Sequence, residues 1–404
     1  MVTRRAVLGG ALGVGALGTT ALTGTAIAMS DAVPDPAAGP VRNPGPAAAR
    51  LPLTVVNHTG QFADKEISVS IVGTDLASGQ QAYVSRGAGA LARVNHGLNG
   101  PAGSADLSVP LDPGGSLTLD LPRMSGRIYI TVGGRLRFPV VTDGNGRPAF
   151  QHPAGWVATD PSFGLLHDFV EFTFNEAGLF CNTTMVDMFS IPLAITLTGK
   201  RTQTTGTLVD GGRAGIFAAI AALPGYRSLI VGDGLRVIAP GHALDAKLFP
   251  TGYFDGYVDQ VWATYARTDL LVRTNTGTFT GRVTGDRLVF DGGVRPFARP
   301  STRDILYCDG ALAAPNDGIT GPVAAALGAA FNRATLCDGA IQPTVDATAF
   351  YRHPVANHYA RVMHEHTVDA KAYGFAFDDV ADFASFIHDP APARLTVTLT
   401  PFDS

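Results

Sequence analysis

Short stretches in which apolar and polar residues alternate run through the first part of the chain. They cover residues 53–57, 67–72, 117–121 and 127–132, with Gly, Asn and Pro residues between them. Successive side chains of a β-strand point to opposite faces, so this alternation predicts strands that place one face on an apolar core. Short strands at such spacing are typical of a β-sandwich or β-barrel. We therefore expect an all-β lobe over about residues 51–200.

The middle of the chain, about residues 201–370, has a different pattern. Apolar or Ala-rich runs predict helices at residues 214–223, 258–267 and 321–333, and shorter runs predict strands at residues 270–273 and 287–290. A last alternating stretch at residues 395–399 predicts a strand that returns to the first lobe. The expected fold is mainly β, with an inserted mixed α/β lobe and a wide groove between the two lobes. Polymers bind in clefts of that kind.

The first 50 residues differ from the rest in composition. Arg4 and Arg5 precede an uncharged run that ends in Ala-Ile-Ala at residue 28, which predicts a twin-arginine-like signal peptide over residues 1–28 and a secreted, extracellular protein. A membrane anchor is the alternative, but it would need ~18 or more strongly apolar residues, and this run is rich in Gly and Thr. Residues 29–50 are rich in Pro and Ala and predict a linker. Residues 51–404 are then one folded unit.

Charge excludes some classes of partner. The chain has 30 Lys and Arg residues against 34 Asp and Glu residues, a formal net charge of −4. Nothing in this balance favours electrostatic capture of a nucleic acid or an anionic membrane. A neutral polymer suits such a surface better.

The cysteine and histidine patterns give weaker indications. Cys308 and Cys337 stand in similar contexts, each followed by Asp-Gly, which predicts a disulfide between them and leaves Cys181 unpaired. No Cys-x-x-Cys motif occurs, and the His364-Glu365-His366 sequence does not match the His-Glu-x-x-His pattern of zinc hydrolases. We expect no metal site.

Two carboxylates stand in the part of the chain with the densest polar chemistry. On a strand over residues 168–175, Glu171, Thr173 and Asn175 share one face. If residues 182–189 pair antiparallel with this strand about a turn near Gly178, Asp187 lies beside Glu171 on that face. Glycoside hydrolysis uses such a pair, one as a protonated acid and one as a base or nucleophile. The alternative is that both are ordinary solvated surface acids.

The residues around this pair resemble glycoside hydrolase family 64. The resemblance rests on Asp168-Phe-Val-Glu171-Phe-Thr-Phe-Asn175, Gly178-Leu-Phe180 and Asn182-Thr-Thr-Met-Val-Asp187-Met-Phe-Ser-Ile191-Pro-Leu, and it extends over residues 51–404. It implies a thaumatin-like β-barrel joined to an α/β domain. It also implies a cofactor-independent endo-β-1,3-glucanase that releases short laminari-oligosaccharides. The segment Tyr373-Gly-Phe-Ala-Phe-Asp378-Asp379 is similar to the Tyr-x-Phe-x-x-Asp-Asp segment that lines the cleft of thaumatin-like proteins.

The resemblance also implies roles for individual residues. Glu171 matches the general acid of the family and Asp187 its general base, which implies inversion at the anomeric carbon. The positions that match sugar-contacting residues of the family, or line its groove, are Thr173, Asn175, Phe180, Asn182, Thr184, Asp378 and Asp379. Separately, the aromatic residues of the middle region suggest Tyr253 and Tyr257 as further sugar contacts.

Two other functions stay open at this point. A non-catalytic thaumatin-like glucan-binding protein would use the same acids only to hydrogen-bond sugar hydroxyls. A hydrolase of another neutral polysaccharide would use the same pair on a different sugar, because one fold and one carboxylate pair serve many substrates. For β-1,3-glucan as the partner, we expect the protein to act as a monomer.

Overall fold

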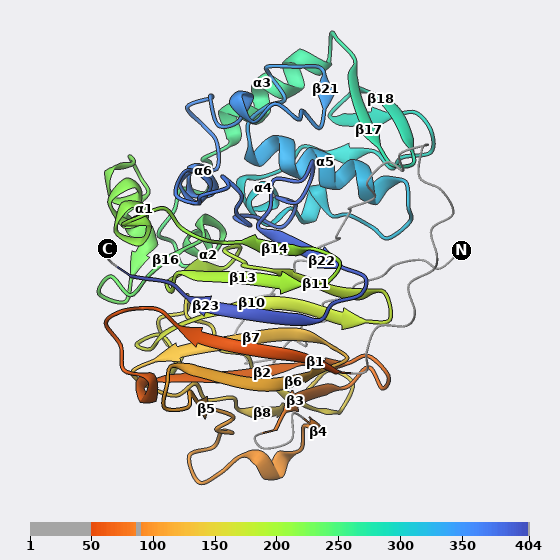
Figure 1. Ribbon diagram of the computed structural model, residues 1–404. Coiled ribbons are helices and arrows are strands. Elements are labelled where there is room, and N and C mark those ends of the chain that lie inside the picture. The colour runs from red at the N-terminus through yellow and green to blue at the C-terminus, as the bar shows by residue number, and fades with distance from the viewer. Residues whose placement is uncertain (1–49, 86–89, 403–404) are drawn as a thin grey trace.

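The computed structural model describes residues 50–85 and 90–402, so the predicted signal peptide and nearly all of the predicted linker lie outside the described residues. Two large sheets fill the lower half of Figure 1. The smaller has five strands in the order β14-β13-β23-β1-β6. Their bounds are β1 Arg50–Asn57, β6 Ser116–Pro122, β13 Leu193–Thr198, β14 Thr202–Thr205 and β23 Arg394–Leu399.

The larger sheet has eight strands, in the order β22-β11-β10-β7-β2-β3-β4 with β5 beside β2. Their bounds are β2 Ile67–Asp75, β3 Gln81–Val84, β4 Leu91–Arg93, β5 Val109–Pro110, β7 Met124–Val132, β10 Leu166–Asn175, β11 Gly178–Asn182 and β22 Phe386–Asp389. Gly73 and Gly126 face each other where β2 meets β7, and a Cβ on either would overlap the backbone of the other strand. Glycine at both positions therefore permits the close approach of these two strands.

The two sheets enclose one apolar core. Ile128 and Ile130 of β7, and Val170 and Phe172 of β10, point into it together with Val55 of β1. Burial of a single side chain of this size stabilises the fold by ~1.5–3 kcal/mol. The predicted alternation is confirmed here: even-numbered residues of β7 and β10 enter the core, and odd-numbered residues face the other way.

A mixed α/β region covers the upper half of Figure 1. Its helices are α1 Gly212–Ala222, α2 Pro240–Asp245, α3 Asp255–Tyr265, α4 Thr302–Tyr307, α5 Thr320–Asn332 and α6 His358–Glu365. Its strands are β12 Met188–Phe189, β15 Ile230–Val231, β16 Arg236–Ile238, β17 Leu270–Thr274, β18 Gly277–Thr284, β19 Arg287–Phe290, β20 Phe297–Ala298 and β21 Ile341–Gln342. A separate hairpin of β8 Val140–Thr142 and β9 Pro148–Phe150 lies in the lower half of Figure 1. Among the residues described, no helix is long and apolar enough to cross a membrane.

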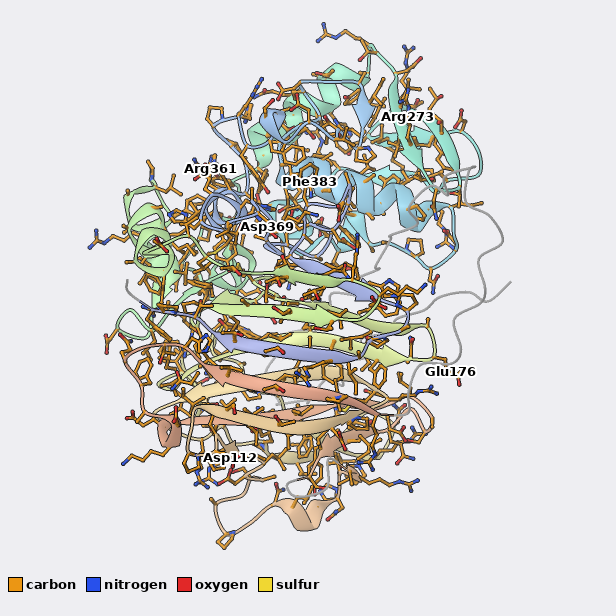
Figure 2. All side chains as sticks on the ribbon, viewed as in Figure 1. Asp112, Glu176, Arg273, Arg361, Asp369 and Phe383 are labelled. Carbon is orange, nitrogen blue, oxygen red and sulfur yellow. The ribbon has the colours of Figure 1, made fainter. Side chains whose placement is uncertain are left out.

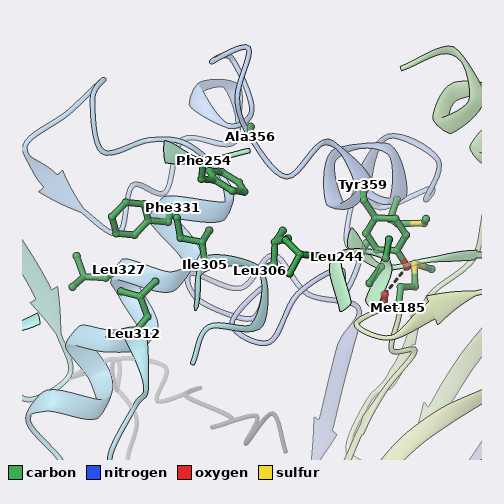
Figure 3. Close-up of a cluster of buried hydrophobic side chains, with 14 of the residues drawn as sticks. Met185, Leu244, Phe254, Ile305, Leu306, Leu312, Leu327, Phe331, Ala356 and Tyr359 are labelled. Atoms are coloured by element: carbon green, nitrogen blue, oxygen red, sulfur yellow. Dashed lines mark hydrogen bonds between the residues drawn. The ribbon is translucent and has the colours of Figure 1, made fainter. Parts of the chain in front are cut away.

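A second apolar core joins the helices to the larger sheet. Leu327 and Phe331 of the buried helix α5 pack in it with Ile305 of α4, as Figure 3 shows. At the other end of this core, the Tyr359 hydroxyl donates a 2.6 Å hydrogen bond to the carbonyl of Met185, which lies between β11 and β12. The core thus connects the helical region directly to the chain segment that carries Asp187.

Each helix and strand that the sequence predicts is present, with small differences at the ends. The three predicted helices correspond to α1, α3 and α5, and the predicted terminal strand is β23, which pairs parallel with β1 and antiparallel with β13. The fold is mixed and strand-rich with several sheets. The short helices α2, α4 and α6 were not predicted, because one or two turns carry too little apolar periodicity.

The predicted disulfide between Cys308 and Cys337 is wrong, since both thiols are free in the structure. Cys308 ends α4 and is buried, where its sulfur lies 3.5 Å from the Asn332 amide nitrogen. Cys337 follows α5 and packs near Tyr257. The matching Cys-Asp-Gly contexts therefore belong to two separate segments, one directly after α4 and one in the loop after α5.

Candidate active site

The outward face of the larger sheet carries a row of polar side chains. Arg127 of β7 lies directly opposite Glu171 of β10 in the antiparallel ladder, and Ser125 lies opposite Thr173. The two hydroxyls of the second pair are 2.8 Å apart. These residues share a face because each is two positions from the next on its strand. This face is the one that the apolar sandwich core leaves free.

Arg127 joins the two candidate carboxylates. Its Nη2 lies 3.0 Å from Glu171 Oε1 and 3.4 Å from Asp187 Oδ2, and its Nε donates to the same Glu171 oxygen at 3.1 Å. The guanidinium carbon of Arg127 lies 4.2 Å from the ring centroid of Phe169, so the ring packs against the guanidinium. The Glu171 side chain is 12% exposed and that of Asp187 is 19% exposed. Both carboxylates are therefore mostly enclosed yet retain access to solvent.

Asp187 lies near Glu171 as predicted, but the strand pairing that was expected to place it there is not the one observed. The strand register places Asn182 opposite Glu171, not Asp187. Asp187 lies just beyond, in the segment before β12, where its carbonyl accepts a 3.0 Å hydrogen bond from Ala239 NH. Its Oδ1 is 2.8 Å from His242 Nε2. The hairpin about Gly178 is formed as predicted, and the chain then turns back to bring Asp187 to the same guanidinium.

The environments of the two carboxylates push their pKa values apart. Burial raises the pKa of Glu171, and the nearby Asp187 charge raises it further, against the opposing effects of Arg127 and Asn182. Burial also acts to raise the pKa of Asp187, but the hydrogen bond and charge of His242, together with Arg127, outweigh it and hold that pKa below 3.8. Two acids whose pKa values differ in this way can act as a proton donor and a proton acceptor at the same pH.

The other residues that the resemblance predicts around the hairpin lie on or near the same face. Thr173, Asn182 and Thr184 are buried, and Asn182 hydrogen-bonds the Glu171 side chain. Asn175 is partly exposed at the end of β10, where its Oδ1 accepts from Ala177 NH. Thr184 Oγ1 accepts from Val186 NH, within the segment that leads to Asp187.

Phe180 stands at the centre of a small aromatic patch. It lies opposite Thr173 on one side and opposite His388 of β22 on the other. Its ring stacks on that of His388, with centroids 4.1 Å apart, and Phe386 lies 6.4 Å away. All three rings are partly exposed. They form a partly exposed aromatic surface next to the strand that carries Glu171.

Asp378 is not a groove residue, contrary to the expectation. Its side chain is completely buried, where it forms a 3.0 Å ion pair with Arg333 and a 2.9 Å hydrogen bond with His364. Asp379, the next residue, is partly exposed. The buried ionic cluster ties α5 and α6 to the segment after residue 373, so the role of Asp378 is to hold the fold.

Tyr257 is also not a sugar contact. It is fully buried on the inner side of α3, and its hydroxyl accepts a 2.9 Å hydrogen bond from Leu336 NH. Tyr253 is partly exposed, but its hydroxyl donates to the Ala356 carbonyl and lies 3.1 Å from that of Tyr226. Both hydroxyls are directed at protein partners inside the α/β region, and none of these contacts involves the carboxylate pair.

Three site residues were missed from the sequence. Arg127 falls within a predicted strand, and a lone arginine among apolar residues was the available signal for it. His242 lies on the two-turn helix α2, and Trp156 stacks on its ring with centroids 4.3 Å apart. Neither of these two has a local pattern that points to Asp187, because the contact forms only when distant segments fold together. No group of three or more His, Cys, Asp or Glu residues could hold a metal ion within the described ranges.

Comparisons with known proteins show the family of the chain. The model of glycoside hydrolase family 64, β-1,3-glucanase, matches residues 49–399. A glucan endo-1,3-beta-glucosidase from Cellulosimicrobium cellulans is 34% identical over 302 residues, which are 71% of this chain and 54% of that protein. The chain thus spans about half the length of that relative.

Solved structures resemble the chain over most of its length. A laminaripentaose-producing β-1,3-glucanase, crystallised in complex with laminaritetraose, has a TM-score of 0.80 at 37% identity, over 88% of this chain and 100% of that one. A β-1,3-glucanase domain from Clostridium beijerinckii has a TM-score of 0.76 at 28% identity, over 89% and 100%. Because the family model spans nearly all of the described residues, the chain belongs to glycoside hydrolase family 64, the β-1,3-glucanases.

Proposed function

We propose that this protein is an endo-acting β-1,3-glucanase in which Glu171 is the general acid and Asp187 the general base. The observation that carries the proposal is the pair itself: two mostly enclosed carboxylates bound to one guanidinium, with pKa values displaced in opposite directions. A raised pKa keeps an acid protonated for the leaving oxygen, and a lowered pKa keeps a base ionised. The names of the relatives support β-1,3-glucan as the substrate class.

The proposed reaction inverts the anomeric carbon. Asp187 takes a proton from a water molecule, the water oxygen forms a bond to the anomeric carbon, and the glycosidic C–O bond breaks. Glu171 gives its proton to the departing oxygen, so one proton enters the pair and one leaves it. Arg127 is suited to hold both carboxylates at fixed positions throughout. No cofactor is needed for these steps.

The glucan is proposed to lie across the outward face of the larger sheet. The aromatic patch of Phe180, Phe386 and His388 would stack on the apolar face of a glucose ring. Asn175, which is partly exposed at the end of β10, would hydrogen-bond a sugar hydroxyl through its side-chain amide. In this proposal the sandwich corresponds to the thaumatin-like barrel of the family, and the groove runs between it and the α/β region.

The remaining features are also proposals. The products are short laminari-oligosaccharides, the enzyme acts as a monomer, and the Arg4-Arg5 leader directs secretion. Export can be checked by expressing the full chain in a bacterial host and sequencing the N-terminus of the secreted protein. We expect cleavage after residue 28.

The test of the proposed function uses linear β-1,3-glucan and three variants. Wild type should release reducing ends, while Glu171→Gln and Asp187→Asn should lose ~10²–10⁴-fold in kcat. Glu176→Gln is the matched control, because Glu176 directly follows the same strand, with a side chain that is 86% exposed and points into solvent in Figure 2. If the wild-type protein sediments with intact glucan and releases no reducing ends, a binding protein is favoured instead.

A further inference from the structure

The imidazole of His242 is held on three sides next to Asp187. Its Nε2 lies 2.8 Å from Asp187 Oδ1, and its Nδ1 lies 3.3 Å from the hydroxyl oxygen of Tyr307. The Trp156 ring stacks on it at 4.3 Å with an angle of 19° between the planes. The His242 side chain is 14% exposed. The ring cannot turn without breaking one of these contacts.

His242 and Tyr307 lie on two short helices, α2 and α4, that pack against each other. His242 lies in α2, and Tyr307 is the last residue of α4. A Cβ added at Gly241 would lie only 3.0 Å from the Tyr307 ring, so the absence of a side chain there lets the ring approach. The Ala239 NH that precedes α2 also binds the Asp187 carbonyl. The backbone of the residue before α2 and a side chain within α2 therefore both contact Asp187.

The donors and acceptors along this chain of bonds can be assigned. The Tyr307 hydroxyl has one proton and donates it to Asp245 Oδ2 at 2.8 Å. The Tyr307 oxygen is then an acceptor for His242 Nδ1–H. The ionised Asp187 carboxylate also only accepts, so Nε2–H donates to it. An imidazole that donates from both nitrogens is an imidazolium.

We propose that His242 is a positioning residue for the base Asp187, held as a two-nitrogen donor by Tyr307 and Asp245, and this inference rests on the proposed function. His242 occupies Oδ1 of the base. A carboxylate has about four lone-pair sites, and the bond from Arg127 to Oδ2 is long at 3.4 Å. Oδ2 is thereby left as the oxygen that accepts the proton of the attacking water.

Other charged groups also act on this pair. Arg127 of β7 and Glu171 of β10 face Asp187, and Arg303 of α4 forms a 3.1 Å ion pair with Asp245. Arg127 stabilises the ionised base from the side opposite His242. Burial and the Asp245 charge raise the pKa of Tyr307, so its hydroxyl keeps its proton over the working range. Loss of His242 alone therefore weakens, but does not abolish, the ionisation of Asp187.

The test measures kcat and KM against pH for His242→Ala, His242→Gln and Tyr307→Phe. Because His242 stabilises the ionised form of Asp187, the acid limb of kcat should move up by about 1 pH unit in His242→Ala. Tyr307→Phe should move it in the same direction by less, and the amide donor of His242→Gln should restore part of kcat at the optimum. KM should change little, because the proposed contact of His242 is with Asp187 and not with the sugar. His96→Gln, at an exposed histidine, is the control.

Two further results separate this inference from the proposed function. If Asp187→Asn keeps wild-type turnover, the proposed function itself fails. If Asp187→Asn is inactive but the acid limb is unchanged in both His242→Ala and Tyr307→Phe, only the role of His242 is overturned. Should His242→Ala not fold, ¹⁵N NMR of wild type gives the answer: two protonated ring nitrogens at the pH of maximal activity support the proposal, and a neutral tautomer contradicts it.

Discussion

Arg127 lies directly opposite Glu171 in the ladder between β7 and β10, with 3.0 Å between its Nη2 and the Glu171 carboxylate. This contact acts against the burial that raises the pKa of Glu171. The same nitrogen reaches Asp187, so one cation limits the repulsion between two neighbouring acids. Arg127 thus affects both the geometry of the site and the protonation of its acid.

Replacement of Arg127 by Met should shift the whole pH profile upward. Without the cation, the pKa of Glu171 rises, so the alkaline limb, where activity falls as Glu171 loses its proton, moves to higher pH. The pKa of Asp187 also rises, and the acid limb follows. The measurement is kcat/KM against pH. Arg127→Lys, which keeps the charge, should shift the limbs less, and an unmoved alkaline limb in Arg127→Met would contradict the account.

Replacement of Asp187 by Asn should lower the pKa of Glu171. The Asp187 charge is one of the causes that raise that pKa, so its removal makes Glu171 ionise more readily. ¹³C NMR titration of labelled glutamate side chains in wild type and Asp187→Asn measures the change directly. A Glu171 titration midpoint that stays in place or rises would show that the two carboxylates do not interact.

Replacement of Phe180 by Ala should weaken glucan binding more than turnover. Loss of one stacking ring is expected to cost ~1 kcal/mol, or roughly fivefold in KM. Phe180→Trp, with a larger ring at the same site, should lower KM. Steady-state kinetics on laminari-oligosaccharides measures both. If the Ala variant changes kcat and leaves KM alone, the aromatic patch does not bind sugar.

Replacement of Asp378 by Asn should destabilise the fold. It leaves Arg333 buried without its counter-ion, and breaking such a pair costs ~3–5 kcal/mol. Urea unfolding measures the free energy. Asp382→Asn is the control, because its carboxylate pairs with Lys371 but is 86% exposed, and such pairs contribute ~0–1 kcal/mol. Equal stability of the two variants would contradict the structural role given to Asp378.

The same cluster predicts a pH window for stability. Although burial opposes it, the bonds to His364 and Arg333 lower the pKa of Asp378 below 3.8, so its contribution is lost as pH falls through that lowered pKa. Against the effect of burial, Asp378 raises the pKa of His364 above 6.5, so its contribution is present below 6.5 and lost as pH rises through the raised pKa. The stability difference between wild type and His364→Gln should therefore be largest between about pH 4 and 6.5. A difference that grows above that range would contradict this sign.

Sequence patterns located the sheets and the carboxylates because both leave a local signal. The alternation in β7 and β10 separates the buried residues Ile128 and Val170 from the polar ones, and this is enough to put Glu171 on an open face. The alternation in β7 also places Arg127 on the polar face. It does not predict which strand pairs with β7. That information appears only in the pairing of β7 with β10.

The residues that could not be predicted depend on contacts between distant segments. His242 meets Asp187 across 55 positions of sequence, and it lies on a helix too short to show periodicity. Tyr257 and Asp378 have the residue types of sugar contacts, yet packing of α3 and of α5 against α6 buries both. Aromatic or acidic character alone does not separate a core residue from a surface one when the partner element is unknown.

The most direct test of the central claim is the anomeric configuration of the first product from linear β-1,3-glucan, followed by ¹H NMR before mutarotation. Because Asp187 acts as a base through a water molecule, the new reducing end should appear first as the α-anomer. Initial release of the β-anomer would mean retention and would contradict the role of Asp187 as a general base.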